Sequence, residues 1–356
     1  MATGLIKQEI ASVLMKKGLG GVNSTSRLSA WCLGSLVCSD ALAEMLTIQG
    51  LAQASADHLR TCSESPYSTP DDICAAVYTV ARMARTIKIS KTLAKAGCVK
   101  LLAHHLNTSV DPQVLLWTAR AVGCLMRPNS SDMSKALLDA GTAKGLARLP
   151  RVLPTEEVEP LESFAFAIQR FSCAEWGGGT RKALVEAGVV DSLLAALRTA
   201  ADVPYPHVHI ELALAVSFLG DVGGSAIRKE IISAGGIDIL KKVGASGRPE
   251  VAKACNMAVT SITGNLWTRN AGAFVLCFLS IRVLMLADFF CHSICQDSDG
   301  SQLDRRMSRL PTCVSPDPTY YRRLTCSNFF LPSPTAVQTL LYVLVTEFET
   351  GDCLIK

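Results

Sequence analysis

Aromatic residues are scarce in this sequence: they make up 6% of its 356 residues, whereas 49% of the residues are hydrophobic. β-Sandwiches and β-barrels draw heavily on aromatic and β-branched side chains. Apolar content that comes so largely from alanine and leucine favours closely packed helices instead. The composition therefore predicts an all-α protein with enough apolar surface for a sizeable core.

The sequence also has little net charge, formally +4, and no long run of charge of one sign. Basic pairs such as Lys16–Lys17 and Arg305–Arg306 are short and typical of solvated positions. Neither feature indicates a nucleic-acid partner.

Recognisable sequence motifs for catalysis, metal binding and cofactor binding are absent as well. Cys291 and Cys295 flank His292, but no second pair of ligands stands at zinc spacing. The segment 176–179, Trp-Gly-Gly-Gly, lacks the Gly-Lys-Ser/Thr ending of a phosphate-binding loop. No nucleophile is paired with a base, so the sequence predicts a protein that is not an enzyme and uses no metal or cofactor.

Two histidine pairs are interpreted as structural. His207 and His209 precede a long helix with no cysteine or carboxylate at ligand spacing, which favours a rim position. His104 and His105 fall at the end of a predicted helix, where a cationic imidazole would suit the helix dipole.

No signal peptide is visible, because Lys7, Gln8 and Glu9 interrupt the first apolar stretch. The sequence contains 14 cysteines, and those before residue 260, such as Cys32 and Cys74, mostly lie within apolar helical patterns. A thiol in such a pattern usually acts as a small buried hydrophobe. We therefore expect free thiols and a reducing location, cytoplasmic or nuclear.

A short helix that ends in Ala-Gly recurs along the chain. Copies occupy residues 91–97, 135–141, 182–188 and 229–235, and a weaker copy ends at Gly50. From Gly50 onward the glycines are 47, 44, 47 and 47 residues apart, and Gly4 lies 46 residues before Gly50. Two helices that meet at a sharp angle need a corner residue that tolerates positive φ. The constant step therefore predicts a repeat architecture.

A longer segment of helical periodicity separates successive glycine corners. These segments are Leu28–Cys38, Ile73–Met83, Leu115–Met126, Leu161–Cys173, Ile210–Leu219 and Val251–Ile262. Apolar residues at three- and four-residue spacing indicate helices buried on more than one side. Each unit is predicted to contain a short helix, a glycine corner, a second helix, a loop and a long helix.

This three-helix period resembles the armadillo repeat family over residues 4–265. The resemblance implies a right-handed α-solenoid of stacked three-helix armadillo repeats, about five and a half in number. In that family the long third helices line a concave groove that holds an extended partner segment. The expected function is a non-catalytic scaffold or adaptor for protein–protein interaction.

The resemblance also suggests a binding site. In peptide-binding armadillo proteins such as importin-α, the third helix carries a Trp and, four residues later, an Asn. The aligned Trp-like positions here are Trp31, Tyr78, Arg120, Phe166, Leu214 and Met257; the Asn-like positions are Ser35, Arg82, Cys124, Arg170, Phe218 and Ser261. Because no Asn-like position holds Asn, a nuclear-import adaptor is disfavoured.

We expect the first four residues of each row to bind the partner: Trp31, Ser35, Tyr78, Arg82, Arg120, Cys124, Phe166 and Arg170. Alternating aromatic rings and guanidinium groups suit an extended acidic or phosphorylated peptide. The alternative is that the aromatic side chains belong to the core and the arginines only solvate the helix surface.

Two other functions stay open at this point. A regulator of a small GTPase, similar to a GDP dissociation stimulator, would need an acidic groove for a basic lipidated tail, and the groove arginines argue against it. A membrane-associated tethering scaffold would depend on the apolar run 272–291, which contains Arg282 and Asp288. Membrane association is therefore not expected.

The repeat pattern departs from regularity at both ends. A corner glycine is due near residue 282, but Ile281 and Arg282 stand there, so we predict a solenoid over 1–270 and an irregular tail over 271–356. The tail could be a mistranslated segment, a helical cap with a helix over 336–347, or a membrane anchor. At the other end no short helix precedes Gly4, which indicates either a half-repeat cap or a start that lies upstream. The oligomeric state stays open.

Overall fold

The computed structural model describes residues 9–127, 130–174, 178–201, 204–245 and 247–264. The described part is built from α-helices and one short π-helix, η1 (Leu14–Gly18), and contains no strand. The predicted all-α class is confirmed. Gly4, Trp176, the predicted boundary near residue 270, the whole tail and the apolar run 272–291 lie outside the described residues. Within the described ranges, no helix is long and apolar enough to cross a membrane.

The long helices form where the apolar pattern predicts them. They are α2 (Ser24–Leu36), α5 (Pro70–Met83), α8 (Pro112–Leu125), α11 (Glu159–Ala174), α14 (Pro206–Val222) and α17 (Pro249–Thr263). Each begins two to four residues before the predicted start, because polar caps and proline extend the first turn. The side chains of Asn23, Thr69 and Asp111 each accept a hydrogen bond from a backbone N–H of that turn. Proline occupies the start of α5, α8, α14 and α17.

Two shorter helices precede each later long helix. The first helices are α3 (Asp40–Ile48), α6 (Ile87–Lys95), α9 (Ser131–Asp139), α12 (Gly178–Glu186) and α15 (Gly224–Ser233). The second helices are α4 (Leu51–Glu64), α7 (Cys98–Thr108), α10 (Thr142–Val152), α13 (Val189–Ala200) and α16 (Gly236–Gly244). All five predicted corner glycines between them have left-handed φ, from 78° at Gly235 to 100° at Gly50. The prediction that these corners need glycine is confirmed.

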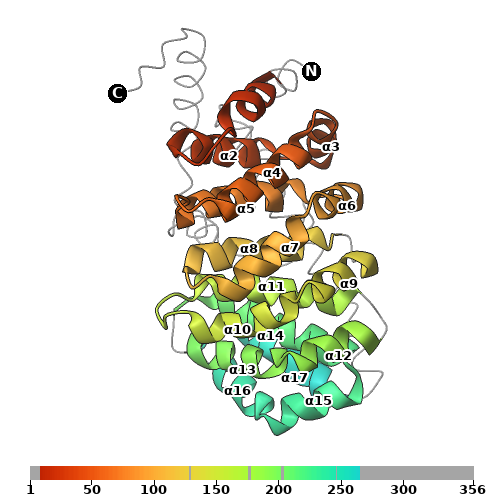
Figure 1. Cartoon of the computed structure of the whole chain (residues 1–356). Helices are drawn as coiled ribbons and strands as arrows, with labels where there is room; N and C mark the ends of the chain where they lie inside the picture. The colour runs from red at the N-terminus through yellow and green to blue at the C-terminus, as the bar shows by residue number, and fades with distance from the viewer. Residues whose placement is uncertain (1–8, 128–129, 175–177, 202–203, 246, 265–356) are drawn as a thin grey trace, which may run out of the picture. The chain divides into compact units, whose positions relative to one another are not determined.

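Neighbouring repeats pack through like helices (Figure 1). Each long helix packs against the long helix before it and the one after it, so that α8 lies between α5 and α11. The second helices pack on the long helices of their own repeats and on one another, as α7, α10 and α13 do. The core lies between these two layers and includes the fully buried Phe164 and Phe171 of α11.

A polar contact that the sequence analysis did not foresee joins each second helix to the next glycine corner. The residue ten positions after a corner glycine reaches the following corner in consecutive repeats. Arg60 Nη2 donates to Ala96 O at 2.7 Å, Asn107 Nδ2 to Gly141 O at 3.3 Å, and Arg198 Nη2 to Ala234 O at 3.1 Å, while the Arg151 guanidinium lies beside Gly188. Carbonyls at a helix end lack partners within the helix. The side chains of Arg60, Asn107 and Arg198 satisfy them across the repeat boundary.

We predict that Arg60→Ala lowers the free energy of unfolding by about 1 kcal/mol, because the Ala96 carbonyl loses a charged hydrogen-bond donor. Urea unfolding followed by circular dichroism measures the change. Asp57→Asn is the control, since it removes the charge that pairs with Arg60 at 2.6 Å, between side chains that are 41% and 50% exposed, and leaves an amide oxygen to accept from Gln53. Equal losses in both variants would assign the effect to the ion pair and not to the corner bond.

Candidate functional site

The predicted binding residues lie on the long helices α2, α5, α8 and α11. Within this part of the chain, the helices that pack on the long helices belong to the same or a neighbouring repeat. Trp31, Arg120, Phe166 and Arg170 are each partly exposed. None of the helices that the structure describes therefore covers the face that carries these residues.

At two places in the chain, a glycine on one long helix leaves space for an aromatic ring of the next long helix. A methyl group on Gly34 would lie 2.5 Å from Cε1 of Tyr78, and a methyl group on Gly123 would lie 2.4 Å from Cδ1 of Phe166. No Cβ atom fits at such distances, so each ring occupies the space above a glycine. Tyr78 of α5 thus rests on α2 in the same way as Phe166 of α11 rests on α8.

Three aromatic rings from three successive long helices are in mutual contact. The Trp31 and Tyr78 centroids are 4.5 Å apart, those of Tyr78 and Trp117 are 4.8 Å apart, and those of Trp31 and Trp117 are 5.8 Å apart. Trp31 and Trp117 are partly exposed, whereas Tyr78 is only 6% exposed. We call Trp31, Tyr78 and Trp117 the aromatic cluster. It offers a continuous stacking surface across three repeats.

Trp117 was missed by the sequence analysis. It lies on α8 three residues before Arg120, the position that the alignment placed in the Trp-like row. One helical turn separates the two residues, so both side chains are on the same side of α8. A search one turn to either side of the aligned row would have found it.

The half of the face that is formed by α8 and α11 carries guanidinium groups. The Arg120 guanidinium lies 4.7 Å from the centroid of the Phe166 ring, and the Arg170 guanidinium lies 5.3 Å from it. Arg120 of α8 and Arg170 of α11 thus share one aromatic platform. Such cation–π contacts favour both groups and fix their positions.

The other three predicted residues have different surroundings. Ser35 Oγ lies 3.3 Å from Tyr78 Oη, and either hydroxyl can donate. Arg82 donates from Nη2 to Val37 O at 2.8 Å and from Nε to Gly34 O at 3.3 Å, so its guanidinium caps the C-terminal end of α2. Cys124 is a partly exposed thiol on α8. Of the three groove arginines, Arg82 therefore has its donors directed into the fold.

Two carboxylates lie close to the guanidinium groups. Glu162 Oε1 is 3.9 Å from Arg120 Nη1, and its Oε2 is 3.6 Å from His207 Nε2. Gln169 Nε2 donates to Glu211 Oε2 at 2.8 Å. Burial, followed by the charge of Glu162, raises the pKa of Glu211 to about 7. This half of the face is consequently mixed in charge.

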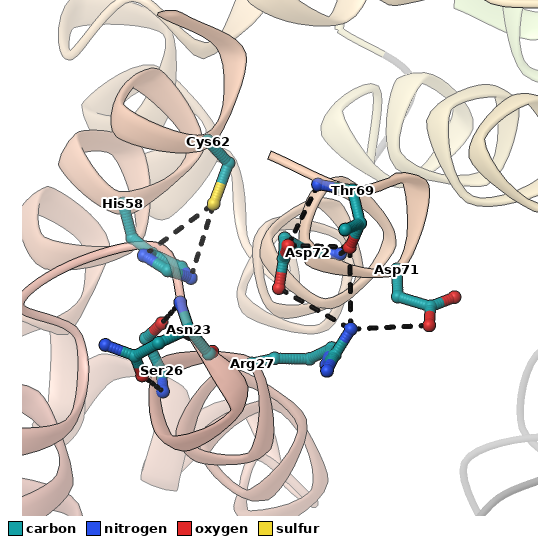
Figure 2. Close-up of polar contacts among 8 residues, drawn as sticks. All are labelled: Asn23, Ser26, Arg27, His58, Cys62, Thr69, Asp71 and Asp72. Carbon is teal, nitrogen blue, oxygen red and sulfur yellow. Dashed lines mark hydrogen bonds and ion pairs between the residues drawn. The ribbon is translucent and has the colours of Figure 1, made fainter. Parts of the chain in front are cut away.

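A separate polar cluster lies at the N-terminal ends of α2 and α5 (Figure 2). Asn23 and Ser26 form a capping box on α2, and Thr69 and Asp72 form one on α5. Arg27 Nη1 lies 3.4 Å from Asp71 Oδ2 and 3.8 Å from Asp72 Oδ1, so it joins the two helix starts. These contacts account for the cluster as a structural feature.

A buried thiol and imidazole lie beside that cluster on α4 (Figure 2). Cys62 Sγ is 3.7 Å from His58 Nε2. Burial raises the pKa of the Cys62 thiol to about 12 and lowers the pKa of His58. The pair is therefore neutral at physiological pH and lacks the thiolate that a nucleophilic cysteine requires. No group of three potential metal ligands occurs among the described residues.

Two expectations for the histidines are wrong. His209 was expected at a rim, but it is buried, with 4% exposure. His105 was expected to be cationic at a helix end, but its side chain is 5% exposed and burial lowers its pKa to about 4. Its Nε2 lies 2.8 Å from Ser63 Oγ of the preceding second helix. Desolvation outweighs the helix dipole at this position.

Several solved structures have a similar fold. An engineered protein matches with a TM-score of 0.58 at 22% identity, over 72% of this chain and 96% of its own. A designed armadillo repeat protein in complex with the peptide (KR)4 matches with a TM-score of 0.57 at 18% identity, over 72% and 99%. Computationally designed armadillo repeat proteins for modular peptide recognition match with a TM-score of 0.56 at 16% identity, over 71% and 98%.

By sequence, no protein-family model and no curated protein matches the chain. The fold assignment rests on the order of the helices, the left-handed corner glycines and the structural similarity. At these identities the similarity establishes architecture alone. The chain therefore has the fold of an armadillo-type repeat solenoid, as the sequence resemblance implied.

Proposed function

We propose that this protein is a non-catalytic scaffold that binds an extended protein segment along the face formed by α2, α5, α8 and α11. The observation that carries this proposal is the aromatic cluster. Its two tryptophans are partly exposed on α2 and α8, the long helices on either side of α5, although burial of such large rings would stabilise the fold. Partly exposed, closely grouped aromatic side chains are typical of binding surfaces.

The two halves of the face suit different parts of one segment. Apolar, aromatic or proline side chains would stack on the aromatic cluster. Acidic or phosphorylated side chains would bind near Arg120 and Arg170, where guanidinium groups are held against Phe166. The designed armadillo repeat proteins with a similar fold, one in complex with a peptide and others made for peptide recognition, support a peptide-binding role.

The cellular setting belongs to the same proposal. Burial raises the pKa of the Cys32 thiol to about 11 and that of Cys98 to about 12, so both behave as inert core residues. Buried thiols of this kind suit a reducing compartment. We therefore place the protein in the cytoplasm or nucleus and assign it a binding role without chemistry of its own.

A displayed library of random extended peptides, selected on the full chain, tests the function. We predict that Trp117→Ala weakens binding of the selected peptides at least about 10-fold, because it removes one of two partly exposed rings of the cluster. Fluorescence anisotropy of labelled peptides measures the dissociation constants. Arg82 is unsuitable for this test, because its substitution would also uncap α2.

Tyr67→Ala is the matched control, since Tyr67 is an aromatic residue with 86% exposure in the loop before α5. Its substitution should leave peptide affinity unchanged. A library that yields no binder, or binders that tolerate Trp117→Ala as well as Tyr67→Ala, would contradict the proposed function.

A further inference from the structure

We infer that the face carries a site for a phosphate group between α8 and α11, built by Arg170 together with Arg120. The inference rests on the proposed function and names one chemical feature of the segment, a phosphorylated side chain. Two observations carry it: the environment of Arg170, and the platform that holds both guanidinium groups.

Arg170 is a partly buried cation that forms no ion pair with an acidic side chain of the described ranges. Its positive charge favours the ionised form of Glu211, but no ion pair joins the two side chains. Burial lowers the pKa of Arg170, and the positive charge of Arg127 lowers it further, as does that of Arg120. Arginine nevertheless stays protonated in proteins. A guanidinium drawn out of water beside like charges is unfavourable unless an anion neutralises it.

The helix α8 brings a second cation to the same place. The guanidinium groups of Arg120 and Arg170 contact the same ring, that of Phe166, so the two groups lie close together. Cys124, a short side chain, follows Arg120 by four residues on the same side of α8.

The Phe166 ring fixes the positions of the Arg120 and Arg170 guanidinium groups before any ligand binds. The ring rests against Gly123, which leaves it no space to move toward α8. Arg120 and Arg170 both contact it, at 4.7 Å and 5.3 Å from the ring centroid. Guanidinium groups that are already oriented lose less side-chain entropy on binding an oxyanion.

A phosphate fits this arrangement better than a carboxylate does. A phosphorylated side chain carries between 1.5 and 2 negative charges, roughly, and three acceptor oxygens, which suits a cluster of guanidinium forks. A carboxylate carries one charge and two oxygens. Two guanidinium groups would be left incompletely neutralised by a single aspartate or glutamate.

The nearby carboxylates oppose the site only weakly. The pair of Glu162 with Arg120 is 3.9 Å long, and both side chains are about one-third exposed, 30% and 35%, so it contributes little and can open. Glu211 is hydrogen-bonded to Gln169, not to Arg170. Burial raises its pKa to about 7, which leaves it partly protonated at neutral pH and reduces its repulsion of an anion.

Inorganic phosphate is the first probe, titrated into the full chain by isothermal titration calorimetry at constant ionic strength. Wild type should bind it saturably, and Arg170→Gln should weaken binding at least about 10-fold. Arg170→Lys should give an intermediate affinity, because it retains the charge and loses the fork. Arg151→Gln, which replaces an exposed arginine on α10, should bind as wild type does.

Stability separates a binding role from a structural one. The contact of Arg170 with Phe166 stabilises the unliganded fold, whereas the loss of water around its charge destabilises it, so Arg170→Gln should unfold at about the same urea concentration as wild type. A lower unfolding midpoint, together with unchanged phosphate binding, would overturn the inference. The absence of saturable phosphate binding by wild type would overturn it too.

A second set of probes distinguishes the source of the phosphate. Selected peptides that carry phosphoserine should bind more tightly than the same peptides with serine or glutamate, and Arg170→Gln should abolish that preference. Trp117→Ala should weaken both forms, so loss of the phosphate preference and loss of peptide binding are separate results. Binding to phosphatidylcholine vesicles doped with a phosphoinositide, without preference for phosphopeptides, would overturn the inference of a phosphorylated segment.

Discussion

Acidification from about pH 6.5 to about pH 4 should reduce the free energy of unfolding by about 3 kcal/mol through His105 alone. Burial lowers the pKa of this imidazole from 6.5 to about 4 in the folded protein. The unfolded chain therefore takes up a proton below pH 6.5 that the folded protein takes up only near pH 4. Stability that is present above pH 6.5 is lost as the pH falls through this window.

The geometry explains the size of the expected effect. His105 is 5% exposed, so solvent screens its charge little. Ser63 Oγ donates to Leu59 O at 2.7 Å, which leaves the hydroxyl oxygen to accept from His105 Nε2 at 2.8 Å. This contact suits a neutral imidazole. His58, whose pKa is also lowered by burial, should add to the loss in the same direction.

Urea unfolding at several pH values between about 4 and 7 measures this dependence. His105→Gln should make the stability less dependent on pH, because the titrating group is removed. His104→Gln, a change in the exposed neighbour on the same helix, should reduce the slope less than His105→Gln does, because burial lowers the pKa of His105 more than the charge of His104 does. A wild-type slope retained in His105→Gln would show that other groups carry the acid sensitivity.

Two glycine-to-alanine substitutions should change stability in opposite directions. A methyl group on Gly145 of α10 would lie 2.6 Å from Leu106 Cβ and 3.0 Å from the Leu106 carbonyl carbon of α7. Relief requires α7 and α10 to separate, because backbone atoms are involved. We expect Gly145→Ala to lower the free energy of unfolding by about 2 kcal/mol, despite the better helix propensity of alanine.

Gly179 of α12 is the matched position, since nothing lies within 4 Å of an added methyl group. Gly179→Ala should raise stability by up to about 1 kcal/mol, so the two variants should differ by about 3 kcal/mol. Urea unfolding followed by circular dichroism measures both. Similar stabilities for the two variants would mean that the α7–α10 contact adjusts without cost.

The repeat itself could be predicted from the sequence because its signal is local. A corner glycine at a nearly constant step reports a backbone requirement, and all five predicted corners have left-handed φ. Long apolar periodicity likewise located the six long helices. The predicted starts were late by two to four residues, because proline and polar caps such as Thr69 belong to a helix without carrying its apolar pattern.

The rows of the candidate site could be predicted in part. The alignment placed Tyr78 and Phe166 in one row, and both rings rest on a glycine of the preceding long helix. It could not foresee that Trp117, one turn away, would contact Tyr78, because that depends on how far α5 and α8 are displaced along each other. Whether the rows bind a partner stays a prediction.

Sequence alone determined the helix period, the glycine corners and the candidate rows, since each depends on residues close together in the chain. Only the tertiary structure decided what individual side chains do there. It directed Arg82 to the end of α2, placed Arg170 against the ring of Phe166, and buried His105 beside Ser63. The physical reason is that hydrogen bonding and desolvation depend on neighbours about one repeat away, which the spacing of residues in one helix does not specify.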